Sequence, residues 1–148
     1  MRVVLAAVVA LVLAAPAQGA IVPGKSIAGV KLGMTETQMV GVLGLPNSVQ
    51  NGSNEFGPFT VFKYRKLTVT FQGNETVTAV KTTRKGEKTP HGVHVGSTKA
   101  QLKAGVTKLK CITKNLCQKG KSVPGARVTV FRLFNGKVTS ILVGFVID

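Results

Sequence analysis

Hydrophobic and polar residues follow two different patterns along the chain, and these patterns recur in the same order. Two short stretches place apolar residues at the three- and four-residue spacing of a helix. The first begins behind Thr35 and ends at Gly44, and the second begins behind Thr98 and is expected to reach Lys110. Because both stretches are short, we expect each helix to depend on a sheet for its packing.

Strands are predicted behind each helix, because β-branched and aromatic residues alternate there with polar ones. We expect strands at 61–64, 67–71 and 76–82 in the first segment, and at 127–134 and 138–146 in the second. Asn135-Gly136 separates the last two strands and is a strong signal for a tight hairpin. The pattern therefore predicts an α+β fold, with short helices packed on one face of an antiparallel sheet.

The two segments align without gaps when Gly29 to Gly44 is placed above Gly92 to Thr107, at an offset of 63 residues. Five aligned pairs are identical: Gly29/Gly92, Val30/Val93, Gly33/Gly96, Thr35/Thr98 and Gln38/Gln101. We therefore predict two tandem α-β-β-(β) repeats, over residues 20–86 and 87–148. Since a unit of about 60 residues buries little surface by itself, the two copies should share or abut their sheets.

Each repeat carries the pattern Thr-x-x-Gln at the start of its helix, as Thr35 with Gln38 and as Thr98 with Gln101. This pattern is typical of a capping box. The threonine oxygen accepts a hydrogen bond from the backbone amide three residues on, and the glutamine side chain accepts one from the threonine amide. We expect these four residues to fix where the two helices begin.

Residues 1–19 are expected to be a cleavable secretory signal peptide. Arg2 precedes an apolar run from Val3 to Ala15, and small residues follow at signal-peptidase spacing. Cleavage before Ala20 and cleavage before Gln18 both fit that spacing. The run is shorter than the roughly 20 residues of a membrane-spanning helix, so no transmembrane anchor is expected in the mature chain. The product is therefore expected to be secreted, outside the cytoplasm.

The chain is strongly basic, and this property restricts its partners. Its net charge is +15, which falls by one, to +14, when Arg2 leaves with the leader. Such an excess attracts anionic partners. Arg84, Lys85 and Lys88 form the tightest cluster and are the candidate contact for a polyanion. The chain has no Trp and one Tyr, so stacking residues for a dedicated nucleic-acid groove are scarce.

Cys111 and Cys117 are the only cysteines of the chain. An even pair in an exported protein predicts a disulfide. Their spacing fits neither a redox C-x-x-C motif nor half of a zinc site. The disulfide is expected to pin one corner of the second repeat.

Residues that could carry catalysis or hold a cofactor are few and scattered. Gly19 to Ser26 match the letters of a P-loop, but the residues that follow are too rich in glycine and β-branched side chains to begin the required helix. His91 and His94 are expected in a loop or strand, as a solvated pair. The carboxylates are isolated from one another, so no acid–base pair is evident. We expect no enzyme activity, nucleotide, metal or cofactor.

One motif of the first repeat resembles a known family. It comprises Gly29, Gly33-Met34-Thr35, Gln38 and Leu43-Gly44, with Pro46 set one place further by Leu45. This motif resembles the opening of the small β-barrel-assembly lipoproteins of the BamE type. Its tandem use in an exported chain is similar to the beta-lactamase inhibitory proteins (BLIP). The resemblance covers most of residues 25–146 and implies helices on one face of a sheet whose other face is open for contact.

The chain departs from both families in its chemistry. No cysteine directly follows the apolar run, so the lipid attachment of the assembly lipoproteins has no counterpart here. The inhibitors bind through an aromatic-rich sheet face, whereas this chain has no Trp and only Tyr64 as a tyrosine. The resemblance therefore implies a fold and brings no partner-binding residue with it.

Two functions are compatible with these features. The first is a protein-binding or inhibitor-like module, whose partner the sequence does not name. The second is a binder of an extracellular polyanion: a cell-wall polymer, an anionic lipid or DNA. Phe56 and Phe59 lie around Gly57-Pro58, and together with Tyr64 they are the candidate partner contact, with ordinary core packing as the alternative.

Overall fold

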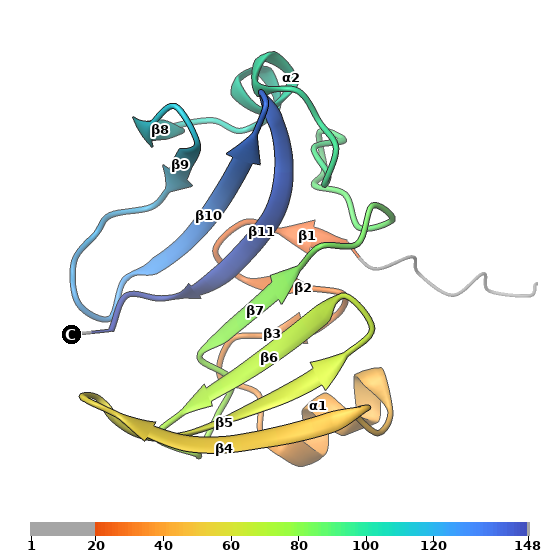
Figure 1. Cartoon of the computed structure of the whole chain (residues 1–148), viewed down its shortest axis with the longest axis vertical. Helices are drawn as coiled ribbons and strands as arrows, with labels where there is room; N and C mark the ends of the chain where they lie inside the picture. The colour runs from red at the N-terminus through yellow and green to blue at the C-terminus, as the bar shows by residue number, and fades with distance from the viewer. Residues whose placement is uncertain (1–19, 148) are drawn as a thin grey trace, which may run out of the picture.

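The structure is a computed structural model that describes residues 20–147 of the chain (Figure 1). The signal peptide predicted for residues 1–19 lies outside the described residues. Residues 20–147 contain two helices, α1 (Glu36–Leu43) and α2 (Lys99–Gly105). A small sheet contains β1 (Ile21–Val22), β2 (Ser26–Ile27) and β3 (Val30–Lys31).

The second sheet has eight strands in the order β4-β5-β6-β7-β11-β10-β9-β8, and all neighbours are antiparallel. Their bounds are β4 (Ser48–Asn54), β5 (Gly57–Tyr64), β6 (Leu67–Gln72), β7 (Ala79–Thr82), β8 (Lys110–Thr113), β9 (Leu116–Lys119), β10 (Arg127–Phe134) and β11 (Lys137–Phe145). The two strands that end the predicted repeats, β7 and β11, are paired at the centre. Strands from both halves of the chain therefore build one sheet.

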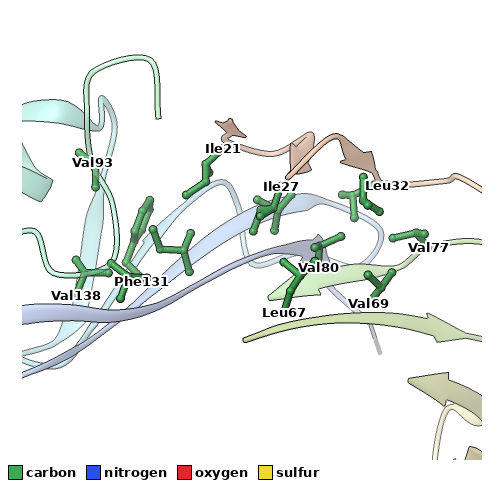
Figure 2. Close-up of a cluster of buried hydrophobic side chains, with 14 of the residues drawn as sticks. Ile21, Ile27, Leu32, Leu67, Val69, Val77, Val80, Val93, Phe131 and Val138 are labelled. Carbon is green, nitrogen blue, oxygen red and sulfur yellow. The ribbon is translucent and has the colours of Figure 1, made fainter. Parts of the chain in front are cut away.

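One face of this sheet forms the hydrophobic core. In β6 the buried residues Leu67, Val69 and Phe71 alternate with half-buried polar ones. Figure 2 shows that Leu67 and Val69 point toward Ile21 and Ile27 of the small sheet. Met39 of α1 and Leu102 of α2 belong to the same buried cluster. Each such side chain stabilises the fold by about 1.5–3 kcal/mol relative to its exposed state.

Both helices begin with the same hydrogen bonds. The Thr35 hydroxyl accepts from the Gln38 amide at 3.3 Å, and the Gln38 side chain accepts from the Thr35 amide at 3.0 Å. At α2 the corresponding distances between Thr98 and Gln101 are 3.2 and 2.8 Å. Thr35 and Thr98 are both extended, which is the usual backbone conformation of an N-cap residue.

The backbone just before each helix is also held in the same way. The Gly33 amide donates to the Val77 carbonyl at 2.8 Å, and the Val77 amide donates to Met34. In the second half, the Gly96 amide donates to the Val138 carbonyl at 2.7 Å, and the Val138 amide donates to Ser97. Each helix start is thereby joined to the final strand region of its own half.

Several sequence predictions differ from the structure. Strand β5 begins at Gly57, four residues before the predicted start at residue 61. Helix α2 ends at Gly105, not at Lys110, because Val106 is extended and Lys108 has a left-handed φ of 56°. Strand β7 begins at Ala79, not at residue 76, because Val77 bonds to the segment before α1 instead. Strands β1–β4, β8 and β9 were not predicted. In β4 every residue is exposed, so its sequence carries no apolar alternation.

Candidate functional site

The face of the eight-stranded sheet that points away from the core carries a continuous row of neighbouring residues. Strand pairing places one residue of every strand in this row: Ser48, Lys63, Thr68, Lys81, Leu142, Val130, Gln118 and Lys110. Directly opposed residues of antiparallel strands point to the same side of a sheet. We call the side that carries this row the open face.

The open face is basic. Its row contains Lys63, Lys81 and Lys110, and all three are exposed. None of the eight strands contains an acidic residue. Between the charges lie half-buried side chains such as Thr68, Val130 and Leu142. The surface therefore combines hydroxyl and aliphatic groups with an uncompensated positive charge.

A hollow is lined by residues at the ends of β5, β6 and β7 near the β5–β6 turn. Figure 1 shows these three strands side by side. The hollow has a volume of about 260 Å³, and it is lined by three lysines, two threonines, Tyr64 and Leu67. The lysines are Lys63, Lys66 and Lys81, and the threonines are Thr68 and Thr83. Within residues 20–147 the ammonium groups of these lysines have no hydrogen-bond or ion-pair partner. Their charges are therefore available to a ligand.

The turn that carries Lys66 is held by the segment after β7. The Thr83 amide donates to the Lys66 carbonyl at 3.0 Å, and Arg84 Nε donates to the Arg65 carbonyl at 2.8 Å. Arg84 is in turn paired with Glu87 across 3.3 Å. Glu87 is 4% exposed and accepts a second bond from the Thr82 hydroxyl. This network fixes the position of Lys66.

The three residues of the predicted polyanion cluster have different surroundings in the structure. Arg84 contacts Glu87 and the Arg65 carbonyl, so its guanidinium has a structural role. Lys85 and Lys88 remain exposed. The basic cluster that does line a hollow, Lys63, Lys66 and Lys81, was missed because strand register unites residues that are far apart in the sequence. The alternation of polar and apolar residues within each strand was the sequence signal that could have pointed to this cluster.

The predicted aromatic contact is divided between different places. Phe56 is exposed in the turn between β4 and β5. Phe59 covers Gly52 of β4, where any added Cβ would meet its ring. Tyr64 lies on the opposite face of β5, and its hydroxyl donates to the Gly44 carbonyl at 2.9 Å. Burial, and secondarily the charge of Glu36, raises the pKa of Tyr64 above its usual value. These three residues do not form one patch.

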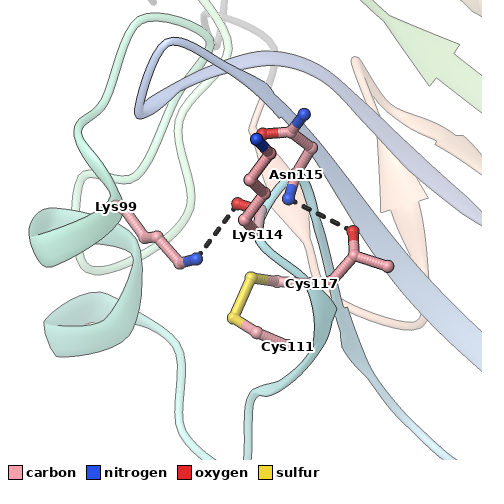
Figure 3. The surroundings of a disulfide bond; sticks show 6 residues. Lys99, Cys111, Lys114, Asn115 and Cys117 are labelled. Atoms are coloured by element: carbon pink, nitrogen blue, oxygen red, sulfur yellow. Dashed lines mark hydrogen bonds between the residues drawn. A yellow bond between two sulfur atoms is a disulfide. The ribbon is translucent and has the colours of Figure 1, made fainter.

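The predicted disulfide between Cys111 and Cys117 is confirmed. It joins residues that lie directly opposite each other in β8 and β9 (Figure 3). The tip of this hairpin is tied to α2, because Lys99 Nζ donates to the Lys114 carbonyl at 3.0 Å. The edge of the sheet at β8 is therefore held by one covalent bond and one contact with the helix.

The remaining candidate motifs occupy local structure. His94 lies within hydrogen-bond distance of the Ser97 hydroxyl and the Gly92 carbonyl, in the loop before α2. In the part of the chain that the structure describes, no three His, Cys, Asp or Glu side chains gather as a metal site. Ser26, the last residue of the P-loop-like pattern, begins strand β2. No helix within residues 20–147 has the length and apolar character to cross a bilayer.

Comparisons with known proteins establish a likeness of fold. No protein-family model matches the sequence, and no curated protein matches it significantly. The structure is similar to the crystal structure of the uncharacterized protein yfeY from Escherichia coli, with a TM-score of 0.51 and 12% sequence identity. The similarity covers 82% of this chain and 95% of the other. At that identity the two proteins share an architecture, a mixed α/β fold dominated by antiparallel strands.

Proposed function

We propose that this chain is an exported binding module that engages an acidic surface of a partner protein through the open face of its sheet. The observation that carries the proposal is the row across all eight strands, which contains three lysines and no carboxylate. Opposite charge on a partner would direct its approach and fix its orientation. The aliphatic and hydroxyl side chains between the lysines would supply contact area.

Export is part of this proposal. The Cys111–Cys117 disulfide supports it, because disulfides persist mainly in oxidising compartments. The signal peptide predicted for residues 1–19 supports it from the sequence. We infer that the mature chain acts outside the cytoplasm.

We also propose that the chain consists of two tandem repeats, 20–86 and 87–148, with a helix of each on the core side of the sheet. The matching capping boxes support this, as do the matching bonds from Gly33 to Val77 and from Gly96 to Val138. A sheet with helices on one side and an open opposite side is the arrangement that the resemblance to the BamE and BLIP families implies. Under this proposal the open face takes the role of contact surface.

Charge reversal on the open face tests the protein-binding proposal. Immobilised mature protein would be exposed to the secreted and envelope proteins of its source, beside the variant Lys81→Glu/Arg132→Glu. Arg132 is exposed two residues after Val130 in β10 and so lies on the open face. We expect a saturable partner to bind the unaltered protein and to lose at least about tenfold in affinity to this variant. The matched control, Lys25→Glu/Lys103→Glu, has the same charge change away from the eight strands and should bind normally. Equal binding by both variants would contradict the proposal.

An extracellular polyanion remains the second candidate, and the net charge of +15 in the full chain favours it. A polyanion contacts many lysines at once and releases counterions, so its affinity should fall steeply with salt. Both charge-reversal variants should then weaken binding to a similar extent. A specific acidic protein should instead distinguish the two variants, because its contact is confined to the open face.

A further inference from the structure

We propose that the hollow lined by Lys63, Lys66 and Lys81 is a binding site for one phosphate-type oxyanion. The inference is independent of the protein-binding proposal, because an oxyanion would contact only the residues that line this hollow. Lys63 and Lys81 flank Thr68 on the open face. Since neighbouring strands lie about 4.8 Å apart, the Cα atoms of these two lysines are separated by about 10 Å. Two extended ammonium groups can reach an anion held between them.

The third lysine closes the hollow from the turn between β5 and β6. Lys66 has a left-handed φ of 58°, and its carbonyl accepts from the Thr83 amide. The Arg84–Glu87 pair anchors the same turn through the Arg65 carbonyl. The backbone of Lys66 is therefore held in place by the fold before any ligand arrives. Preorganisation of this kind reduces the entropy lost on binding.

The surroundings favour an anion over any other ligand. No carboxylate lines the hollow, and the nearby Glu87 is buried and already paired with Arg84. Two other lysines of the chain are engaged with protein oxygens, Lys99 with Lys114 and Lys119 with Thr107. Among the described residues, Lys63, Lys66 and Lys81 have no such acceptor. Thr68 adds a hydroxyl donor between the lysines.

Titration of the whole mature protein with inorganic phosphate, at constant ionic strength, tests this site. We expect saturable shifts in the amide NMR signals of Lys66, Thr68 and Thr83. The variant Lys66→Gln/Lys81→Gln should weaken the affinity by about tenfold or more, because it removes two of the three charged donors. Lys25→Gln/Lys103→Gln removes the same charge elsewhere and should leave the affinity within about twofold.

Two further experiments distinguish a soluble oxyanion from the headgroup of a lipid. Vesicles of phosphatidylcholine with and without phosphatidic acid present the same group as a lipid headgroup. Binding of free phosphate at Lys66 supports a soluble ligand, and binding only to phosphatidic acid vesicles, lost in Lys66→Gln/Lys81→Gln, supports a headgroup. The proposal is overturned if neither probe shifts the three amides, or if the control variant loses as much affinity as the test variant. Neither outcome bears on the protein-binding proposal, which the charge-reversal experiment tests separately.

Discussion

One buried carboxylate, Glu87, determines what the neighbouring basic residues can do. Removing a charged group from water is costly unless it is paired, and Arg84 and Thr82 supply the partners. Arg84 is thereby turned toward the β5–β6 turn, away from any polyanion. A cluster of three basic residues in the sequence thus becomes one structural arginine and two solvated lysines. The charges to which we assign binding are others: Lys63 and Lys81 on the strands and Lys66 in the β5–β6 turn.

Tyr64 offers a direct test of residue-scale electrostatics. Burial, with the charge of Glu36 as a second cause, raises its pKa, so the folded chain holds the phenol proton more tightly than the unfolded chain does. The resulting stability is fully present below the unfolded pKa near 10 and is lost as the pH rises through the folded pKa. We expect tyrosinate absorbance to develop above the usual pH. Tyr64 is the only tyrosine and the chain has no Trp, so the signal is unambiguous.

Two variants separate the causes of this shift. Glu36→Gln removes the nearby negative charge and should move the titration of Tyr64 part of the way back toward its usual value. Tyr64→Phe should remove the loss of stability that tyrosinate formation causes at alkaline pH, as measured by urea unfolding. Titration of Tyr64 at its ordinary pKa in the folded protein would show that the ring is solvated and would contradict the packing against Gly44 and Met39.

At the scale of elements, the capping threonines have the same task in both helices. Thr35→Ala and Thr98→Ala each remove the side-chain acceptor for an otherwise unpaired amide. We expect each change to lower the free energy of unfolding by about 1 kcal/mol, measured by urea denaturation. Thr35→Ser and Thr98→Ser keep the oxygen and should cost much less. A loss confined to one helix would argue against equivalent roles for the two caps.

The elements that could be predicted are those determined by residues close together in the sequence. The capping boxes span only three residues, and the 127–134 and 138–146 strands have a strong turn signal between them. Strand β4 could not be recognised, because an exposed edge strand needs no buried side and its sequence, Ser48–Asn54, is almost entirely polar. The end of α2 depends on the chain path after Gly105. The lysine hollow depends on register among β5, β6 and β7, which no single segment encodes.

At the scale of the whole molecule, the pairing of β7 with β11 decides whether the two halves behave as one body. Val80 lies opposite Val143 in this pair, and both are fully buried. Gly144 lies opposite Ala79, where an added Cβ would come within 3.2 Å of the alanine side chain. Small residues on the open face and valines on the core face thus allow the central strands to pack closely. Core side chains from both halves meet at this pair.

We therefore expect the halves to unfold together, and Val143→Ala to weaken both. The substitution leaves a cavity in the shared core and should cost about 2 kcal/mol. In a urea titration followed by NMR, the amide signals of β6 and β10 should disappear at one common midpoint, which Val143→Ala lowers equally for both strands. Val49→Ala, on exposed strand β4, should change the midpoint little. Separate midpoints for β6 and β10 would mean that each half holds its own core and that the central pairing contributes little to their cohesion.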